Sequence, residues 1–123
     1  MNQKSDFKTT ISEGYSSKGE SIILGGAILN GEAIADAFVK IPLKTLNRHG
    51  LIAGATGTGK TKTIQVLSEQ LSSKGIPVLM MDIKGDLSGI AVEGEQNDKI
   101  NERYAKTQLP YQPQSFPVEL MTI

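Results

Sequence analysis

The chain has 123 residues, of which 38% are hydrophobic and 21% are charged, and its formal net charge at pH 7 is zero. This length suits one small domain with the composition of a soluble globular protein. The neutral balance argues against a strongly basic nucleic-acid surface, and the lack of cysteine excludes disulfides and thiolate metal sites. Because no apolar stretch could span a bilayer or form a signal-peptide core, we expect a cytoplasmic protein without a membrane partner.

The first 46 residues divide into a polar start and a β-rich segment. Residues 1–20 are polar, and we expect a flexible N-terminal segment there. Residues 21–46 are expected to form a small β element and a connector, because two apolar runs flank Asn30-Gly31, which is a strong hairpin signal. Pro42 should end the return strand. The predicted element is an antiparallel hairpin over 21–41, although 32–37 also contains good helix formers.

The strongest motif of the chain is a complete G-x-x-x-x-G-K-[ST] phosphate-binding loop. Glycines let the backbone N–H groups approach phosphate oxygens, and the helix that follows points its positive end at the same place. Lys60 adds a full charge, and the Thr61 hydroxyl suits Mg²⁺. ATP and Mg²⁺ are therefore the expected cofactors, with Lys60 and Thr61 as catalytic residues and Thr61 on the metal. The predicted nucleotide-binding residues are Gly54, Ala55, Thr56, Gly57, Thr58, Gly59, Lys60, Thr61 and Lys62.

The elements around this motif predict an α/β fold. A short apolar run, 49–53, precedes the loop, and a helix is expected over 61–75 with Ile64, Leu67 and Leu71 on one face. Lys74-Gly75 should end that helix, and the apolar run 76–82 reads as the next strand. Such a βαβ unit predicts the α/β fold of a P-loop NTPase, a parallel sheet with helices on both faces.

The rest of the chain offers a short helix over 97–106 and a last strand over 118–123. A P-loop sheet needs about five strands, and about three are present after residue 49. We therefore expect an incomplete sheet, and interpret residues 47–123 as the front part of a larger ATPase domain.

The stretches 47–61 and 82–89 resemble the HerA-like ATPases, and specifically the bacterial branch called DUF853 (YjgR-like), with weaker likeness at 23–26 and 41–43. The resemblance implies a P-loop ATPase of the RecA-like, ASCE type that is related to the FtsK and VirB4 motors, many of which form hexameric rings that move DNA. It also implies a full-length protein that couples ATP hydrolysis to DNA translocation as a homo-oligomer. The Walker B Asp-Glu and the arginine finger, which the family places downstream, are absent from these 123 residues, so we expect little activity from this chain alone.

Three other side chains invite a chemical role. Asp82 follows four apolar residues and could be a metal-side acid, but a structural role is favoured because the strand directly after a P-loop helix lies toward the sheet edge in RecA-like folds. His49 is expected to bond to backbone, and Lys84 to lie on the surface. Two D-x-x-G matches, at 82–85 and 86–89, would fit a GTPase, but no N-K-x-D motif accompanies them.

Two further functions stay open beside the DNA motor. One is a P-loop kinase or another enzyme that acts on a small molecule, which predicts a basic lid. The other is a non-catalytic fragment that binds nucleotide, or nothing, and serves in assembly. A Walker B strand and an arginine finger encoded after residue 123 would favour the motor.

Overall fold

The computed structural model describes residues 3–122, which form three α-helices, two strands and two short 3₁₀ turns. These residues divide into two compact units. The first unit contains residues up to 50 together with 96–111, and the second contains 51–95 together with residues from 112 onward. The expected division into 1–20, 21–46 and 47–123 remains a prediction.

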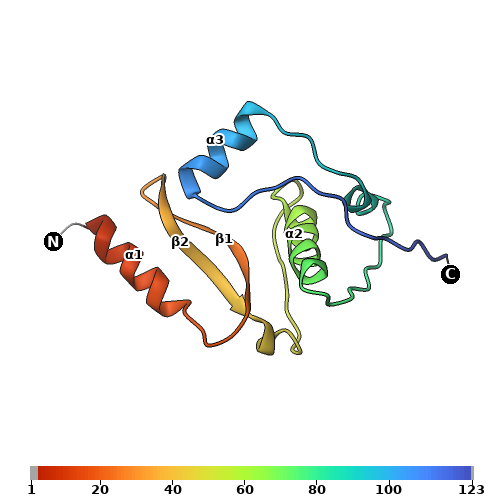
Figure 1. Ribbon diagram of the computed structural model, residues 1–123, viewed down its shortest axis with the longest axis horizontal. Coiled ribbons are helices and arrows are strands. Elements are labelled where there is room, and N and C mark those ends of the chain that lie inside the picture. The colour runs from red at the N-terminus through yellow and green to blue at the C-terminus, as the bar shows by residue number, and fades with distance from the viewer. Residues whose placement is uncertain (1–2, 123) are drawn as a thin grey trace. The chain divides into compact units, whose positions relative to one another are not determined.

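The first unit is built on a β-hairpin, in which β1 (Ser21–Leu29) pairs antiparallel with β2 (Glu32–Pro42) (Figure 1). The two strands are joined by Asn30 and Gly31, whose φ angles of 50° and 82° are both left-handed. Two left-handed residues make the turn whose twist matches that of the flanking strands. The predicted antiparallel element is therefore confirmed, and the helix formers of 32–37 are drawn into β2.

An irregularity in β2 lets two residues that would face opposite sides of a regular strand pack into the same core. Ile34 and Ala37 are three positions apart and would face opposite sides of a regular strand. Both are nevertheless buried in one cluster with Ala27. The register jumps between Gly26↔Phe38 and Ile28↔Ala33, and Asp36 in the skipped stretch has a left-handed φ of 58°. The bulge thus turns Ala37 back toward the core side.

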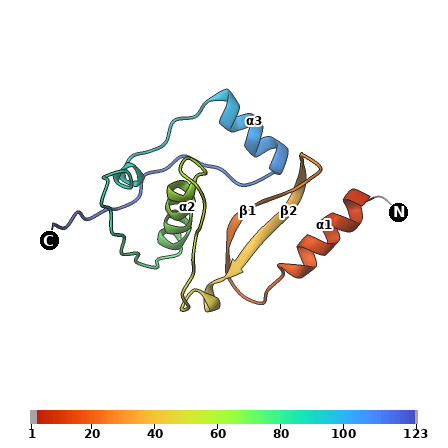
Figure 2. The same cartoon turned by 180° about the vertical axis from the view of Figure 1, so that it is seen from behind.

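Helix α1 (Gln3–Gly14) covers this core, in a segment for which the sequence pattern predicts no element. Phe7 and Ile11, one turn apart, pack against the cluster of Ala27, Ile34 and Ala37. Both views of the ribbon show α1 alongside β2 (Figures 1 and 2).

Two ion pairs link α1 to β2 at its exposed edge. Lys4 pairs with Glu32, and Lys8 Nζ lies 3.4 Å from an Asp36 carboxylate oxygen. The Lys4 ammonium lowers the pKa of Glu32, first through the hydrogen bond and then through its charge. Packing of the apolar pair and these surface contacts together explain why a polar segment becomes a helix in this place.

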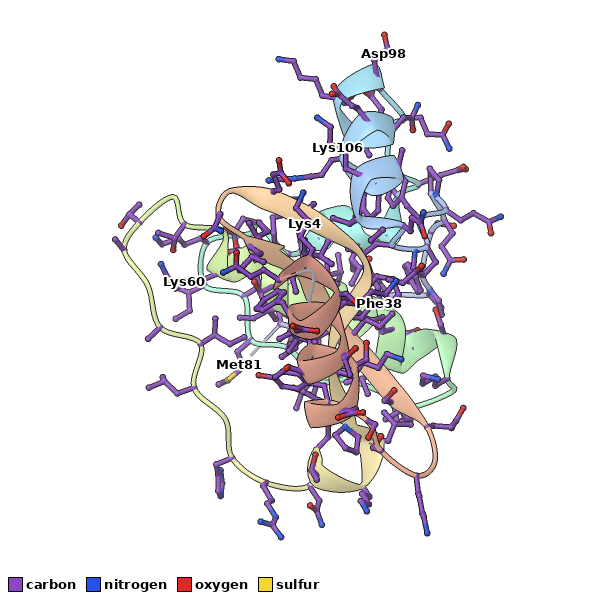
Figure 3. All side chains as sticks on the ribbon, turned by 90° about the vertical axis from the view of Figure 1, so that its left-hand side faces the viewer. Lys4, Phe38, Lys60, Met81, Asp98 and Lys106 are labelled. Atoms are coloured by element: carbon purple, nitrogen blue, oxygen red, sulfur yellow. The ribbon has the colours of Figure 1, made fainter. Side chains whose placement is uncertain are left out.

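Helix α3 (Asp98–Thr107) completes the first unit and confirms the short helix predicted over 97–106. Its N-cap is Asn97, whose side-chain oxygen accepts the Ile100 N–H at 3.0 Å. Asp98 and Lys106 mark its two ends in Figure 3. The ring of Tyr104 stacks on that of Tyr111 with centroids 4.3 Å apart, which fastens the chain after the helix.

The second unit contains one α-helix, α2 (Lys60–Ser73), and the 3₁₀ turn η2 (Ser88–Ala91). The other 3₁₀ turn, η1 (Leu43–Thr45), follows β2 in the first unit. Helix α2 ends as Lys74-Gly75 predicts. Gly75 has a φ of 74°, its N–H donates to Ser72, and the Ile76 N–H donates to Leu71, which is the hydrogen-bond pattern of a Schellman motif.

The predicted parallel sheet is wrong. The only sheet among residues 3–122 is the antiparallel pair β1–β2, and segments 51–53, 76–82 and 118–122 pair with no strand. The side chains of Leu79, Met81 and Leu120 are 82%, 86% and 80% exposed, so these runs are not buried as central parallel strands are. An apolar run alone does not specify a ladder partner. Residue 123 lies outside the described residues.

The helices of the second unit also differ from the predicted arrangement. Because α2 is the only α-helix described there, no second helical layer covers an opposite sheet face. The apolar face expected on α2 is not its buried face either. Ile64 is 39% exposed, whereas the polar residues Gln65 and Ser68 are 6% and 5% exposed.

Candidate functional site: the glycine-rich loop and helix α2

The glycine-rich loop 54–59 leads directly into the first turn of α2. Thr58 N–H donates to the Ala55 carbonyl at 3.4 Å, which closes a tight turn. Gly57 and Gly59 have φ angles of 82° and 94°, and Gly59 is the N-cap of α2. These are conformations that a side chain with a β-carbon would strain. The loop therefore has the geometry for which its glycines are needed.

Gly54 is required for a different reason, which is space. A β-carbon on Gly54 would lie 2.6 Å from the Thr58 side-chain oxygen, a distance that no real contact shows. The Thr58 hydroxyl itself donates to the Ala55 carbonyl at 2.8 Å, so it is held in that position. The loop closes on itself only because residue 54 has no side chain.

Lys60 begins α2 and folds back over the loop. Its ammonium nitrogen donates to the Ala55 carbonyl oxygen at 2.7 Å. The side chain is half-buried at the start of the helix (Figure 3). The Ala55 oxygen thus receives three donors of the loop, from Thr58 N–H, Thr58 hydroxyl and Lys60. The charge of Lys60 is held at the mouth of the loop rather than extended into solvent.

The remaining predicted residues lie beside this mouth. Thr61 occupies the first turn of α2 and is half-buried, while Thr56 and Lys62 are exposed. Within residues 3–122, no hydrogen bond engages the Thr61 hydroxyl, which leaves its oxygen available to a ligand.

The loop fits a Mg²⁺-nucleotide in both space and chemistry. The Gly57 and Gly59 backbone is free of the β-carbons that would strain it, and a lysine ammonium and the N-terminus of a fourteen-residue helix lie at the end of the same loop. The donor set is cationic and amide in character, as phosphate oxygens require, and the Thr61 hydroxyl beside it is a hard oxygen ligand of the kind Mg²⁺ prefers. The residues of the loop therefore match the group that the motif predicts.

The buried face of α2 is polar and was not predicted as a functional surface. Gln65 donates its side-chain amide to the Asp86 carbonyl at 3.1 Å. Ser68 donates to the Ile64 carbonyl at 2.9 Å and contacts the Met80 sulfur at 3.2 Å. The signal in the sequence is the spacing of Thr61, Gln65 and Ser68 at i, i+4 and i+7, which places three polar side chains on one helix face. Apolar periodicity instead predicts the face of Ile64, Leu67 and Leu71 as the buried one.

Asp82 folds the turn that follows the apolar run 76–82. One carboxylate oxygen accepts the Gly85 N–H at 2.8 Å and the Asp86 N–H at 3.3 Å, and the other accepts the Leu87 N–H at 2.9 Å. These backbone hydrogen bonds, with that from Leu87 the largest, lower the pKa of Asp82 below its ordinary value. The structural role favoured for Asp82 is therefore what the geometry displays.

Other charged groups are less organised. Lys84 and His49 are exposed, and Ile83 at the tip of the turn is 99% exposed. Partial burial on α2 raises the pKa of Glu69, against a weaker lowering by the Lys62 charge. In the part of the chain that the structure describes, no three His, Cys, Asp or Glu side chains gather as a metal cluster. Nor is any helix there long and apolar enough to cross a bilayer.

Comparison with known proteins identifies the family. The family model described as helicase HerA-like C-terminal matches residues 28–123. The chain is 36% identical over 67 residues to a protein of Sulfolobus acidocaldarius named DNA double-strand break repair helicase HerA. It is 40% identical over 67 residues to the protein of the same name from Sulfurisphaera tokodaii, and 42% over 48 residues to that of Saccharolobus solfataricus.

These matches cover part of each protein. The first two relatives align with 54% of this chain, which spans only 14% of their own length. The third aligns with 39% of this chain and 10% of the relative. No solved structure matches. Since the family model covers most of the sequence, the resemblance seen at 47–61 and 82–89 is confirmed, and the chain belongs to the HerA-like helicase C-terminal family.

Proposed function

We propose that this chain is the ATP-binding portion of a HerA/FtsK-like motor ATPase, and that the full-length protein couples ATP hydrolysis to DNA translocation. In this proposal, the backbone N–H groups of 54–61 bind the β- and γ-phosphates. Lys60 neutralises their charge, and the Thr61 hydroxyl takes a position on Mg²⁺. Mg²⁺ would stabilise charge on the transferring phosphoryl group when bound.

The observation that carries the proposal is the 2.7 Å contact between Lys60 Nζ and the Ala55 carbonyl oxygen. The ammonium already sits on an oxygen at the mouth of the loop, which a phosphate oxygen would replace. Because this contact already holds the Lys60 side chain over the loop, the exchange should cost little side-chain entropy.

DNA is the polymer that the family favours. The relatives in three archaea are named DNA double-strand break repair helicases, which supports DNA as partner of the full-length protein. We propose that the full-length protein works as a homo-oligomeric ring, with each site completed by a neighbouring subunit. The neutral charge of this chain is compatible with that arrangement, because a ring needs basic side chains only in its pore.

Nucleotide binding is tested by titrating a fluorescent ATP analogue with Mg²⁺ into the wild type, Lys60→Ala and Lys44→Ala. Lys44 is an exposed lysine of η1 and serves as the matched control. A hydrogen bond to a charged group is worth roughly 1.5–3 kcal/mol, so Lys60→Ala should lose on the order of 10- to 100-fold in affinity. Lys44→Ala should bind as the wild type does. Equal affinity in all three proteins contradicts the proposed site.

The motor activity is tested on the full-length protein. ATP turnover should rise when DNA is added, and DNA binding should weaken steeply with salt because released counterions drive it. Sedimentation with ATP should show a closed oligomer. A protein that stays monomeric with ATP and whose turnover ignores both DNA and RNA would contradict the motor and favour an enzyme acting on a small molecule.

A further inference from the structure

We propose that Asp82 is a positioning residue, and that Asp86 is the carboxylate it holds on the metal side of the nucleotide site. The inference rests on the proposed function, since it assigns roles within that site. It separates two aspartates that lie four residues apart in one turn and that a sequence pattern treats alike.

The contacts of Asp82 commit its carboxylate to the backbone of the turn. Both of its carboxylate oxygens accept backbone N–H groups, at 2.8 Å from Gly85 and 2.9 Å from Leu87, with a longer contact from Asp86. A metal on either oxygen would compete with these donors, which close the turn. The carboxylate therefore acts as the cap of a turn, which is a common use of an aspartate at a turn's first position.

The capped turn is fastened to α2 at one point. Gln65, which is only 6% exposed, donates its side-chain amide to the Asp86 carbonyl at 3.1 Å. A buried amide without this acceptor would be left unsatisfied, so the link is strongly favoured once the turn is formed. Asp82 fixes the shape of the turn, and Gln65 fixes its place against the helix.

This link brings Asp86 to the face of α2 that carries Thr61. Thr61 and Gln65 are four residues apart and so are neighbours on the helix surface, about 6 Å from β-carbon to β-carbon. The Asp86 backbone is thus held at the Gln65 side chain, and Gln65 is one helical turn from the residue whose hydroxyl the motif assigns to Mg²⁺. Within residues 3–122, no hydrogen bond or ion pair engages the Asp86 carboxylate.

A carboxylate near the first turn of α2 suits the way in which proteins hold Mg²⁺. This ion keeps several of its waters in nucleotide sites and is held by one or two carboxylates and the phosphates. A carboxylate one turn from Thr61 can accept hydrogen bonds from those waters without coordinating the ion itself. Asp86 is the acid in the turn whose backbone is fixed by Gln65 and whose carboxylate is free to accept such hydrogen bonds.

The test compares binding of a fluorescent ATP analogue with Mg²⁺ and with EDTA, and takes the ratio of the two affinities as the Mg²⁺ enhancement. Asp86→Asn should reduce this enhancement by about tenfold, the effect of 1.4 kcal/mol, and leave the affinity in EDTA unchanged. Asp98→Asn, in the first turn of α3, is the matched control and should keep the full enhancement. A full enhancement in Asp86→Asn overturns the role of Asp86.

Hydrogen exchange separates the two aspartates without nucleotide. Asp82→Ala should lose protection at the Gly85 and Leu87 amides and lose Mg²⁺ enhancement with it. Asp82→Asn, which keeps one acceptor oxygen, should fall between Asp82→Ala and the wild type in both measurements, and Asp86→Asn should keep the protection. If Asp82→Ala loses the enhancement while both amides stay protected, Asp82 binds the metal itself and the inference is wrong.

Failure of the proposed function gives a different result. A wild type that binds the analogue neither with Mg²⁺ nor in EDTA overturns the nucleotide site, and with it the role of Asp86. The exchange measurement still decides whether Asp82 holds the turn. Loss of protection in α2 as well as in the turn would mark a variant that has unfolded, and Asp82→Asn then replaces it.

Discussion

The hydroxyl oxygen of Thr58 lies only 2.6 Å from the position that a β-carbon on residue 54 would take, which is too close for both atoms to be present. The hydroxyl is held there by its 2.8 Å hydrogen bond to the Ala55 carbonyl. Since the same carbonyl accepts the Lys60 ammonium at 2.7 Å, the clearance at Gly54 and the position of the lysine depend on one another.

Gly54→Ala should therefore disturb the loop and lower nucleotide affinity by about fivefold or more, since overpacking of this kind costs about 1–3 kcal/mol. Titration with the fluorescent ATP analogue measures the loss. Gly50→Ala is the control, because a β-carbon there meets nothing within 4 Å. Adding Thr58→Ala to Gly54→Ala should recover part of the affinity, and an unchanged affinity in Gly54→Ala alone would show that the loop opens before it binds.

The hairpin turn should be sensitive to a β-carbon at Gly31. Its φ of 82° is left-handed, and an L-residue pays about 1–2 kcal/mol there, so Gly31→Ala should lower the free energy of unfolding by about that amount. Denaturation in urea measures the change. Gly25→Ala in β1, where the added carbon has open space and φ is not left-handed, should cost less. The reverse order would mean that the turn is not formed as described.

The docking of α1 should depend on its apolar contacts more than on its ion pairs. Phe7 is half-buried against the hairpin core, and the burial lost when its ring is removed is worth about 1–2 kcal/mol. Lys4 and Glu32 are 57% and 63% exposed, and the attraction within so exposed a pair is largely screened by solvent. Phe7→Ala should thus destabilise the chain more than Lys4→Ala in the same urea experiment. A larger effect of Lys4→Ala would show that the ion pair decides the docking.

The turn at 82–87 should respond to acid in a defined direction. Its backbone N–H groups lower the pKa of Asp82, so its stabilising contribution is complete above the ordinary aspartate pKa. The contribution is lost as pH falls through the lower pKa of the folded state. Amide NMR shifts of Gly85 and Leu87 should titrate together below the ordinary aspartate value, and this titration should vanish in Asp82→Asn. A shared midpoint above that value would contradict the capping role.

The 123-residue chain should hydrolyse ATP very slowly even where it binds it. Hydrolysis needs an oriented water, a carboxylate on the metal side and often an arginine from a neighbour. Asp82 is committed to backbone N–H groups and Asp86 is assigned to the metal side, which leaves the oriented water and the arginine to be supplied from elsewhere. A phosphate-release assay measures turnover. Robust turnover that disappears in Lys60→Ala would show that the chain supplies a base that its geometry does not reveal.

Local features of the sequence determined the hairpin turn, the bounds of α2 and α3, and the closed shape of the glycine-rich loop. Asn30-Gly31, Asn97, Gly57, Gly59 and Gly75 each act through dihedral preferences and hydrogen bonds within a few residues, so their effect is readable without a fold. The family is likewise carried by short motifs. For these reasons the candidate site was predictable as a set of residues.

The tertiary structure alone decided which surfaces are buried and what the apolar runs do. Phe7 and Ile11 make α1 a helix by packing on a core that lies more than ten residues further along the chain. Gln65 and Ser68 are buried because Asp86 and Met80 supply partners from a distant turn, which apolar periodicity cannot foresee. The run 76–82 has the composition of a strand, yet a strand exists only where another backbone accepts and donates its hydrogen bonds, and that partner is a property of the folded chain.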